Sequence, residues 1–135
     1  MSAGEDLIRR SVAALNAGDV DGYLAGFARG SVRWALGLDT PLPLSDIEAN
    51  LRQMVTAFDQ LHLQEDLLFG GSGHVFARWT LRGIHTGHYG GIAPTHRAIA
   101  VQTAELYAVS GSVVTESWVY GDLTSLFDQI GVGND

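Results

Sequence analysis

The chain has 135 residues, a formal net charge of −7 and a hydrophobic fraction of 46%. This length predicts one globular domain over residues 1–135, and the acidic balance argues against nucleic acid or an anionic membrane surface as partner. There is no Cys and all eight basic residues are Arg, which excludes disulfides, cysteine–metal sites and lysine Schiff bases. No apolar run approaches the roughly 20 residues of a membrane span, and no signal peptide is apparent. We therefore expect a cytoplasmic protein.

The first part of the chain predicts mainly helices. Apolar side chains recur with helical spacing in two segments, which are separated by a helix-ending Gly18 and a helix-capping Asp19. Ser45 and Glu48 have the spacing of a capping box, which predicts the start of a third helix. In chain order we expect helices at 5–17 and 20–28, a strand at 31–35, a loop at 37–43 and a helix from 45 to about 59.

From residue 61 the apolar pattern changes to the alternation of strands. We expect strands at 61–69, 74–84 and 97–109, a last strand ending at 120, and a short helix or turn at 122–131. The glycine-rich segment 70–73 predicts a hairpin loop, since it lacks the spacing and following helix of a phosphate loop. Helices first and antiparallel strands afterwards predict an α+β fold, in which helices cover one face of a curved sheet.

The strand expected at 97–109 carries the most informative pattern. Its odd positions form a bulky apolar row around Glu105, whereas its even positions are mostly Ala. A carboxyl group in such a row is expected to be either paired with a cation or held in its neutral form. Glu105 is therefore the first candidate catalytic residue. It could instead be a structural acid paired with Arg78 or Arg82, and a catalytic role would need the carboxyl to be free of a close Arg.

The turn at 110–112 decides which face of the last strand joins Glu105. A three-residue loop would place Ser117 and Val119 in the interior. A two-residue loop would place the even-numbered residues 116 to 120 there instead.

Aromatic and histidine side chains are the remaining candidates for a site. His85, His88 and His96 lie in a glycine-rich connection without a nearby acid, so no metal site is expected. A histidine at the mouth of a cavity could still move a proton, and His85 is the candidate. Five aromatic residues have spacings that suit the wall of an apolar pocket: Tyr23, Trp34, Phe58, Trp79 and Tyr107.

Several local motifs extend over most of the chain. They are the segment 14–19, Arg78-Trp79-Thr80, His85-Thr86-Gly87, the segment 92–95, Tyr107, Glu116-Ser117-Trp118 and the tail 126–131. Together they resemble the SnoaL-like polyketide cyclases, which share a superfamily with ketosteroid isomerase and scytalone dehydratase. The resemblance implies a cone-shaped α+β barrel, with the N-terminal helices packed in the concave face of a curved, mostly antiparallel sheet. At the three-residue turn it favours Ser117 and Val119 as the inward pair.

The resemblance also implies where family catalytic residues would fall. The acid/base Asp that these cyclases place after the motif tryptophan is replaced by Val119. The general base of ketosteroid isomerases would fall near Trp34, and their tyrosine near Ser11. Their second acid, a hydrogen-bond donor to an oxyanion, has Glu105 as its counterpart.

These observations lead to two hypotheses of different classes. The first is a cofactor-independent cyclase or isomerase of polyketide-type natural-product (antibiotic) biosynthesis, with Glu105 as acid or hydrogen-bond donor in an apolar cavity. The second is a non-catalytic module that sequesters a hydrophobic small molecule. The expected substrate-binding residues are Tyr23, Trp34, Phe58, Trp79, His85, Thr103, Tyr107, Ser117 and Val119. The Ala-rich face of 97–109 and Trp118 further predict a homodimer formed across the sheet.

Overall fold

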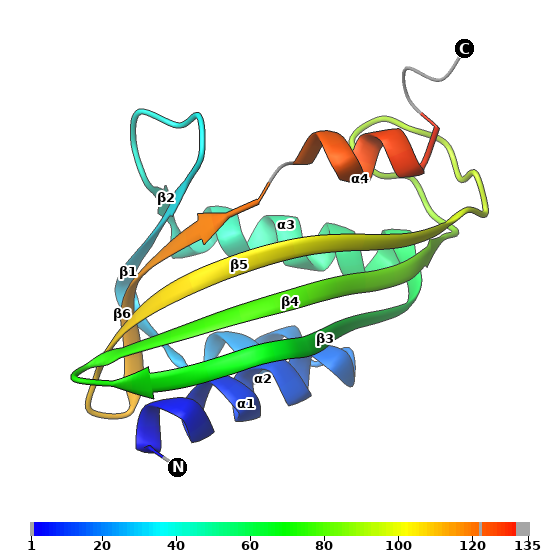
Figure 1. Cartoon of the computed structure of the whole chain (residues 1–135). Helices are drawn as coiled ribbons and strands as arrows, with labels where there is room; N and C mark the ends of the chain where they lie inside the picture. Colours follow the sequence, from blue (N-terminus) through cyan, green and yellow to red (C-terminus); the bar gives the residue numbers. More distant parts are fainter. Residues whose placement is uncertain (1, 122, 132–135) are drawn as a thin grey trace.

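The computed structural model describes residues 2–121 and 123–131. In this part of the chain six strands form one curved sheet in the order β2-β1-β6-β5-β4-β3 (Figure 1). The strands are β1 Phe27–Ala35, β2 Leu42–Pro43, β3 Phe58–Gly71, β4 His74–His85, β5 Ala98–Ser110 and β6 Val113–Tyr120. Neighbouring strands are antiparallel except β1 and β6, which are parallel. The predicted α+β fold with a curved, mostly antiparallel sheet is confirmed.

Four helices accompany the sheet in the described residues: α1 Ala3–Asn16, α2 Val20–Leu24, α3 Leu44–Ala57 and α4 Leu123–Gln129. Figure 1 shows α1, α2 and α3 on one side of the sheet, with α4 at the opposite end from the N-terminus. The Gln129 side chain joins α4 to β5, because it accepts from the Ala100 amide at 2.6 Å and donates to the Ala100 carbonyl at 3.0 Å. None of the described helices is long and apolar enough to cross a membrane.

Two helix starts differ from the prediction: α1 begins at Ala3, two residues earlier than expected, and α3 lacks the predicted cap. α3 begins at Leu44 with Pro43 as its N-cap and no side-chain cap, so the capping box expected at Ser45 and Glu48 is absent. The proline fixes an extended conformation directly before the helix, which places Ser45 inside the first turn. A capping box forms instead at α1, between Ser2 and Glu5.

The second expected helix is shorter than predicted. α2 ends at Leu24 and β1 begins at Phe27, so β1 starts four residues before the expected strand. Between them Gly26 lies against the hydroxyl of Ser11 on α1, where an added Cβ would clash. This close approach needs glycine and ends the helix early.

The β5–β6 turn differs from the three-residue loop favoured above. Ser110 pairs with Val113, so the loop has two residues, Gly111 and Ser112. A bulge at Thr115 then shifts the register, because Val109 pairs with Val114 while Ala108 pairs with Glu116. Glu105 therefore lies opposite Val119, which is the pairing predicted, and a bulge rather than loop length produces it.

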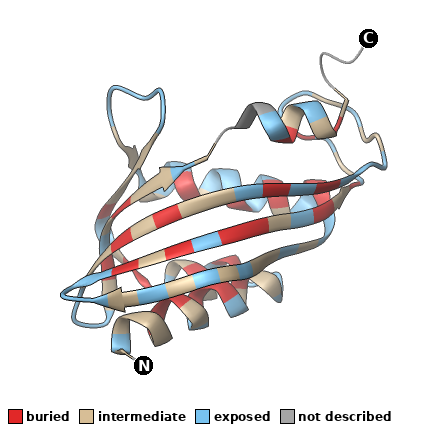
Figure 2. Cartoon of the chain, in the orientation of Figure 1, coloured by how far each residue is buried: buried red, intermediate tan, exposed pale blue. Residues whose placement is uncertain are grey.

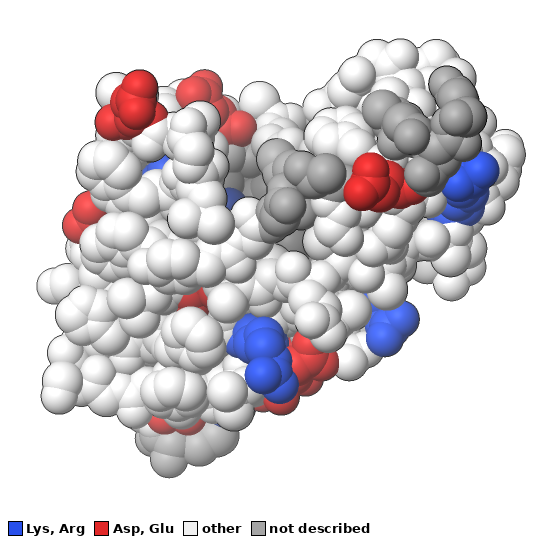
Figure 3. Space-filling view, turned by 45° about the horizontal axis from the view of Figure 1, so that its top comes forward, with Lys and Arg blue, Asp and Glu red and all other residues white. Residues whose placement is uncertain are grey.

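Buried residues alternate with more exposed ones along the central strands (Figure 2). In the part of the chain that the structure describes, the core consists of two clusters. The first core cluster joins α1 and α2 to the sheet and includes Leu15, Trp79 and Tyr107. The second core cluster lies toward α4 and includes Phe58 and Val101. On the face seen in Figure 3, acidic and basic side chains are scattered and no basic stripe is present.

Candidate functional site

Glu105 lies in the middle of β5 on the face that the helices cover, and only 8% of it is exposed. An arginine pairs with it, but from β1: Arg33 Nη2 lies 3.1 Å from Glu105 Oε2. Arg33 reaches this position across β6, where its register partner is Ser117. Arg78 and Arg82, the partners considered from the sequence, are exposed on β4 and lie on the outer face. Glu105 is therefore paired, with a residue that the sequence analysis did not single out.

Hydroxyl groups surround this ion pair. Arg33 Nη2 donates to the Tyr23 hydroxyl at 2.9 Å, and Arg33 Nε donates to Ser117 Oγ at 3.4 Å. Tyr107 lies on the same face of β5, two residues from Glu105, and is buried. Among the described residues no hydrogen-bond donor serves Glu105 Oε2, because the contact with Arg33 has the distance of an ion pair without hydrogen-bond geometry. This oxygen is buried and faces the Arg33 guanidinium, and it accepts no hydrogen bond from the described residues.

Burial and the charge of Glu105 together set the protonation states of the neighbouring Arg33, Tyr23 and Tyr107. Burial opposes the charge of Arg33, but the negative charge of Glu105 and the hydroxyl of Tyr23 raise its pKa above the ordinary value. Burial also raises the pKa of Tyr23, and burial together with Glu105 raises that of Tyr107 well above its usual range. Arg33 therefore stays charged, and both phenols stay protonated and able to donate.

Some of the expected substrate-binding residues gather at Glu105. Tyr23, Tyr107 and Ser117 are buried next to the ion pair, and Val119 is the cross-strand partner of Glu105. Thr103 follows on the same face of β5 and pairs with Trp79 of the first core cluster.

Trp34 is placed differently from the expectation. It pairs with Trp118 across the parallel β1–β6 ladder, and its indole N–H donates to the Glu116 carboxylate at 2.6 Å. Since successive strand residues face opposite ways, Arg33 faces inward and Trp34 outward. Trp34 therefore does not join Glu105. The sequence did not single out Arg33, because one arginine in a short strand carries no periodic signal that would place it inside.

Phe58 and His85 lie in or beside the second core cluster, away from Glu105. His85 is fully buried and does not stand at a cavity mouth. Its Nδ1 accepts from the Thr95 amide at 3.2 Å, and burial lowers its pKa. His85 is therefore a neutral side chain that holds the segment after β4. Within residues 2–121 and 123–131, no group of three or more His, Asp or Glu side chains could hold a metal ion.

The described residues enclose, among others, two cavities on the helical side of the sheet. One of about 280 Å³ has Phe58 in its lining, and one of about 260 Å³ lies between α1 and β3 over Trp79. Glu105 lines neither of them, so neither is the apolar cavity that was expected around Glu105.

The curved six-stranded sheet with helices on one face is similar to the ketosteroid isomerase-like fold of a solved structure from Catenulispora acidiphila, at 16% identity and a TM-score of 0.75 over 93% of this chain and 92% of that one. The chain belongs to the SnoaL-like polyketide cyclase family, whose model matches residues 5–130. No match is found among curated protein sequences.

Solved structures similar to this chain include three from Streptomyces. AclR from Streptomyces galilaeus has 23% identity and a TM-score of 0.87, over 96% of this chain and 98% of that one. TsrD from Streptomyces laurentii has 21% identity and a TM-score of 0.80, over 96% of this chain and 95% of that one. IdmH from Streptomyces antibioticus, a candidate polyketide cyclase, has 20% identity and a TM-score of 0.82, over 98% of this chain and 100% of that one. At these identities the likeness shows the fold alone.

Proposed function

We propose that this chain is a cofactor-independent cyclase or isomerase that acts on a hydrophobic, polyketide-type small molecule, with Glu105 carrying the proton. Membership of the SnoaL-like family supports this reaction class. The observation that carries the proposal is the buried Arg33–Glu105 pair with a carboxylate oxygen that lacks a donor. A cytoplasmic location and a role in antibiotic biosynthesis stay predictions.

The carboxyl of Glu105 is not free of a close arginine, so the condition set for its role as a neutral hydrogen-bond donor is not met, and the role proposed for it changes. A carboxylate facing a guanidinium accepts hydrogen bonds, so Arg33 and Tyr23 take over donation to an oxyanion. Glu105 would first act as a base and afterwards, once protonated, as the acid. Proton transfer thus stays with Glu105, while donation to the oxyanion passes to Arg33 and Tyr23.

The reaction can be written without a cofactor. Glu105 removes a proton from the carbon beside a substrate carbonyl, and the electron pair moves to the carbonyl oxygen. The N–H groups of Arg33 stabilise this oxyanion, an effect worth roughly 3 kcal/mol per donor in other enzymes. The enolate carbon then bonds to a second carbonyl carbon of the same molecule, and Glu105 returns its proton to the new alkoxide. The product is an isomer of the substrate, and the cone restricts the flexible chain to a folded shape.

The binding-module hypothesis is the second candidate, and one observation favours it. Arg33 is hydrogen-bonded to Tyr23 and Ser117 and paired with Glu105, so the cluster is largely satisfied without a ligand. A structural ion pair would look the same. Turnover separates the two functions.

A homodimer formed across the outer face of the sheet is part of the proposal. Register places one apolar row across five strands: Trp34, Trp118, Leu106, Phe76 and Phe69. Phe69 is 56% exposed, and Tyr120 beside the row is 48% exposed. A continuous apolar row on a solvent-facing sheet is typical of an interface between identical subunits. Light scattering should give twice the chain mass at micromolar concentration, and a monomer mass would contradict the dimer.

Proton abstraction can be tested with 5-nitrobenzisoxazole, whose ring opens to a coloured phenolate when a base removes its carbon-bound proton. We expect saturable turnover by the wild-type protein, roughly 100-fold or more above the reaction in acetate buffer. Saturable binding, followed by fluorescence quenching, without turnover would contradict the enzyme proposal and favour the binding module.

A further inference from the structure

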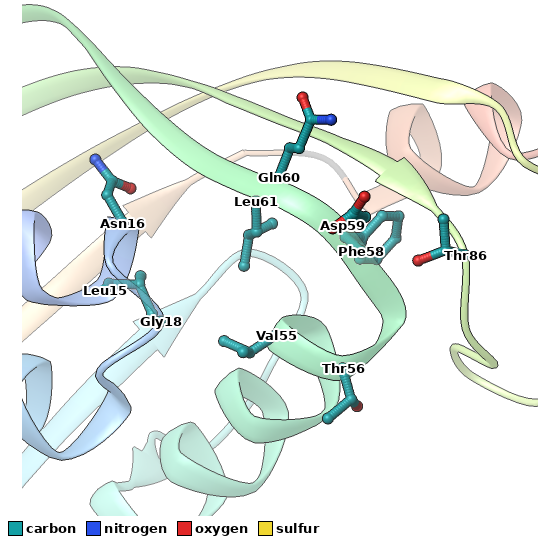
Figure 4. Close-up of a pocket in the computed structure, with 10 residues that line it drawn as sticks. All are labelled: Leu15, Asn16, Gly18, Val55, Thr56, Phe58, Asp59, Gln60, Leu61 and Thr86. Carbon is teal, nitrogen blue, oxygen red and sulfur yellow. The ribbon is translucent and has the colours of Figure 1, made fainter.

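The cavity of about 280 Å³ lies at the boundary between the two core clusters (Figure 4). Leu15 of α1 and Val55 of α3 belong to or pack on the first core cluster, whereas Phe58 and Leu61 of β3 belong to or pack on the second. In Figure 4 the side chains of Leu61 and Val55 are directed toward the same space from opposite sides. The packing of the core is therefore interrupted here, and the interruption opens to the surface.

The backbone at this cavity has an unusual conformation. Gln60 has φ of 55°, a left-handed value that non-glycine residues seldom adopt. It lies in an irregularity of the β3–β4 ladder, where the register shifts between Asp59 and His62. Figure 4 shows the Gln60 amide on the opposite side of β3 from Leu61. Bulges of this kind re-aim side chains and are common beside functional sites, and this one directs Leu61 into the cavity.

The polar side chains at the rim differ in their availability. The Asn16 amide is taken up by the main chain of Leu63, at 2.8 and 3.2 Å, and Thr56 donates to the Gln53 carbonyl at 2.9 Å. By contrast, the side chains of Asp59 and Thr86 make no hydrogen bond to other residues that the structure describes. Asp59 is the one charged residue among those that line the cavity.

We propose that this cavity binds a compact amphipathic molecule that is neutral or cationic. Its apolar body, one or two rings in size, would pack against Leu15, Val55, Phe58 and Leu61. A hydroxyl or ammonium group would donate to Asp59. The volume lies just below the roughly 300 Å³ at which drug-sized ligand pockets begin, which limits the ligand to this size. Arg33 and Glu105 do not line the cavity, so this site is independent of the proposed reaction.

The test uses three probes with one apolar body: 2-naphthylmethanol, 2-naphthylmethylamine and 2-naphthoate. Each is titrated into the ¹⁵N-labelled full chain, and amide shifts are followed by NMR. The alcohol and the amine should shift the amides of Gln60, Leu61 and Thr86. The naphthoate should bind at least about tenfold more weakly because it faces the carboxylate of Asp59. Equal affinity for all three, or shifts confined to the amides around Glu105, would overturn the proposal.

Three variants locate the binding. Thr56→Trp fills the cavity from an exposed helix position and should weaken the amine by roughly tenfold or more. Gln53→Trp, on the same helix and outside the lining, is the matched control and should bind as the wild type does. Asp59→Asn keeps the shape and should bring the amine and naphthoate to within about threefold of each other. Unchanged binding in a folded Thr56→Trp protein, or unchanged discrimination in Asp59→Asn, would contradict the site.

Discussion

The two faces of β1, β6 and β5 hold a carboxylate in different ways. On the inner face Glu105 is buried and pairs with the charge of Arg33 at 3.1 Å. On the outer face Glu116 is half-buried and accepts a neutral hydrogen bond from the Trp34 indole at 2.6 Å. Arg33 and Trp34 are consecutive residues, so one position of strand register decides which partner each acid receives. The inner pair is the costly one to break, because a charge left alone there is away from water.

The largest expected effect is on the inner face. Arg33→Met leaves Glu105 buried without its cation and should lower the free energy of unfolding by about 3–5 kcal/mol in urea titrations. Arg33→Met combined with Glu105→Leu removes both charges and should recover much of that loss. If Arg33→Met alone costs less than about 1 kcal/mol, the pair behaves as a solvated surface contact and the comparison between the two faces fails.

Aspartate introduced on opposite faces sharpens the comparison. Val119→Asp places a second carboxylate across from Glu105 and should lower stability by about 2 kcal/mol, without raising turnover. Tyr120 lies on the outer face, so Tyr120→Asp should leave the unfolding midpoint nearly unchanged. It should lower the average mass measured by light scattering, because fewer chains would form the dimer. A large gain in turnover for Val119→Asp would show that the interior lacks only the family's usual acid.

His85 is buried on the inner face without an ionic partner, so it should make stability depend on pH. Burial lowers the pKa of His85, and the charges of His96 and His88 lower it further. The unfolded chain therefore takes up the proton first, and stability should fall as the pH drops below about 6.5. One proton contributes at most about 1.4 kcal/mol per pH unit. Urea titrations at high and low pH should show a flatter dependence for His85→Gln than for the exposed control His62→Gln.

The smallest effect is expected on the outer face. Trp34→Phe keeps most of the apolar surface and removes the hydrogen bond to Glu116, which stays in contact with water. The loss should be about 1 kcal/mol or less in urea titrations. A loss as large as that of Arg33→Met would show that the two faces do not differ in the way described.

The sequence predicted the elements with strong periodicity and the inward row around Glu105. It did not predict the placement of Arg33 and Trp34, because one arginine in a short strand carries no periodic signal that would place it inside. Tertiary structure decides the placement: the parallel pairing with β6 places Arg33 beside Ser117 and within reach of Glu105.

Local irregularities in the strands could not be predicted from the sequence either. The bulge at Thr115 restores the predicted pairing after a shorter turn than expected, and the left-handed Gln60 lies in the lining of the cavity at β3. No glycine or proline marks either position. Both depend on how neighbouring strands pair, which side-chain periodicity does not encode.

The central claim is that Glu105 carries the proton, and Glu105→Gln tests it most directly. This variant keeps the shape of the side chain but cannot accept the proton, so turnover of 5-nitrobenzisoxazole per folded protein should fall about 100-fold or more, and as far as in Glu105→Ala. Glu116→Gln, the matched acid on the outer face, should retain wild-type turnover. Wild-type turnover in folded Glu105→Gln protein would contradict the account and leave the Arg33–Glu105 pair a structural one.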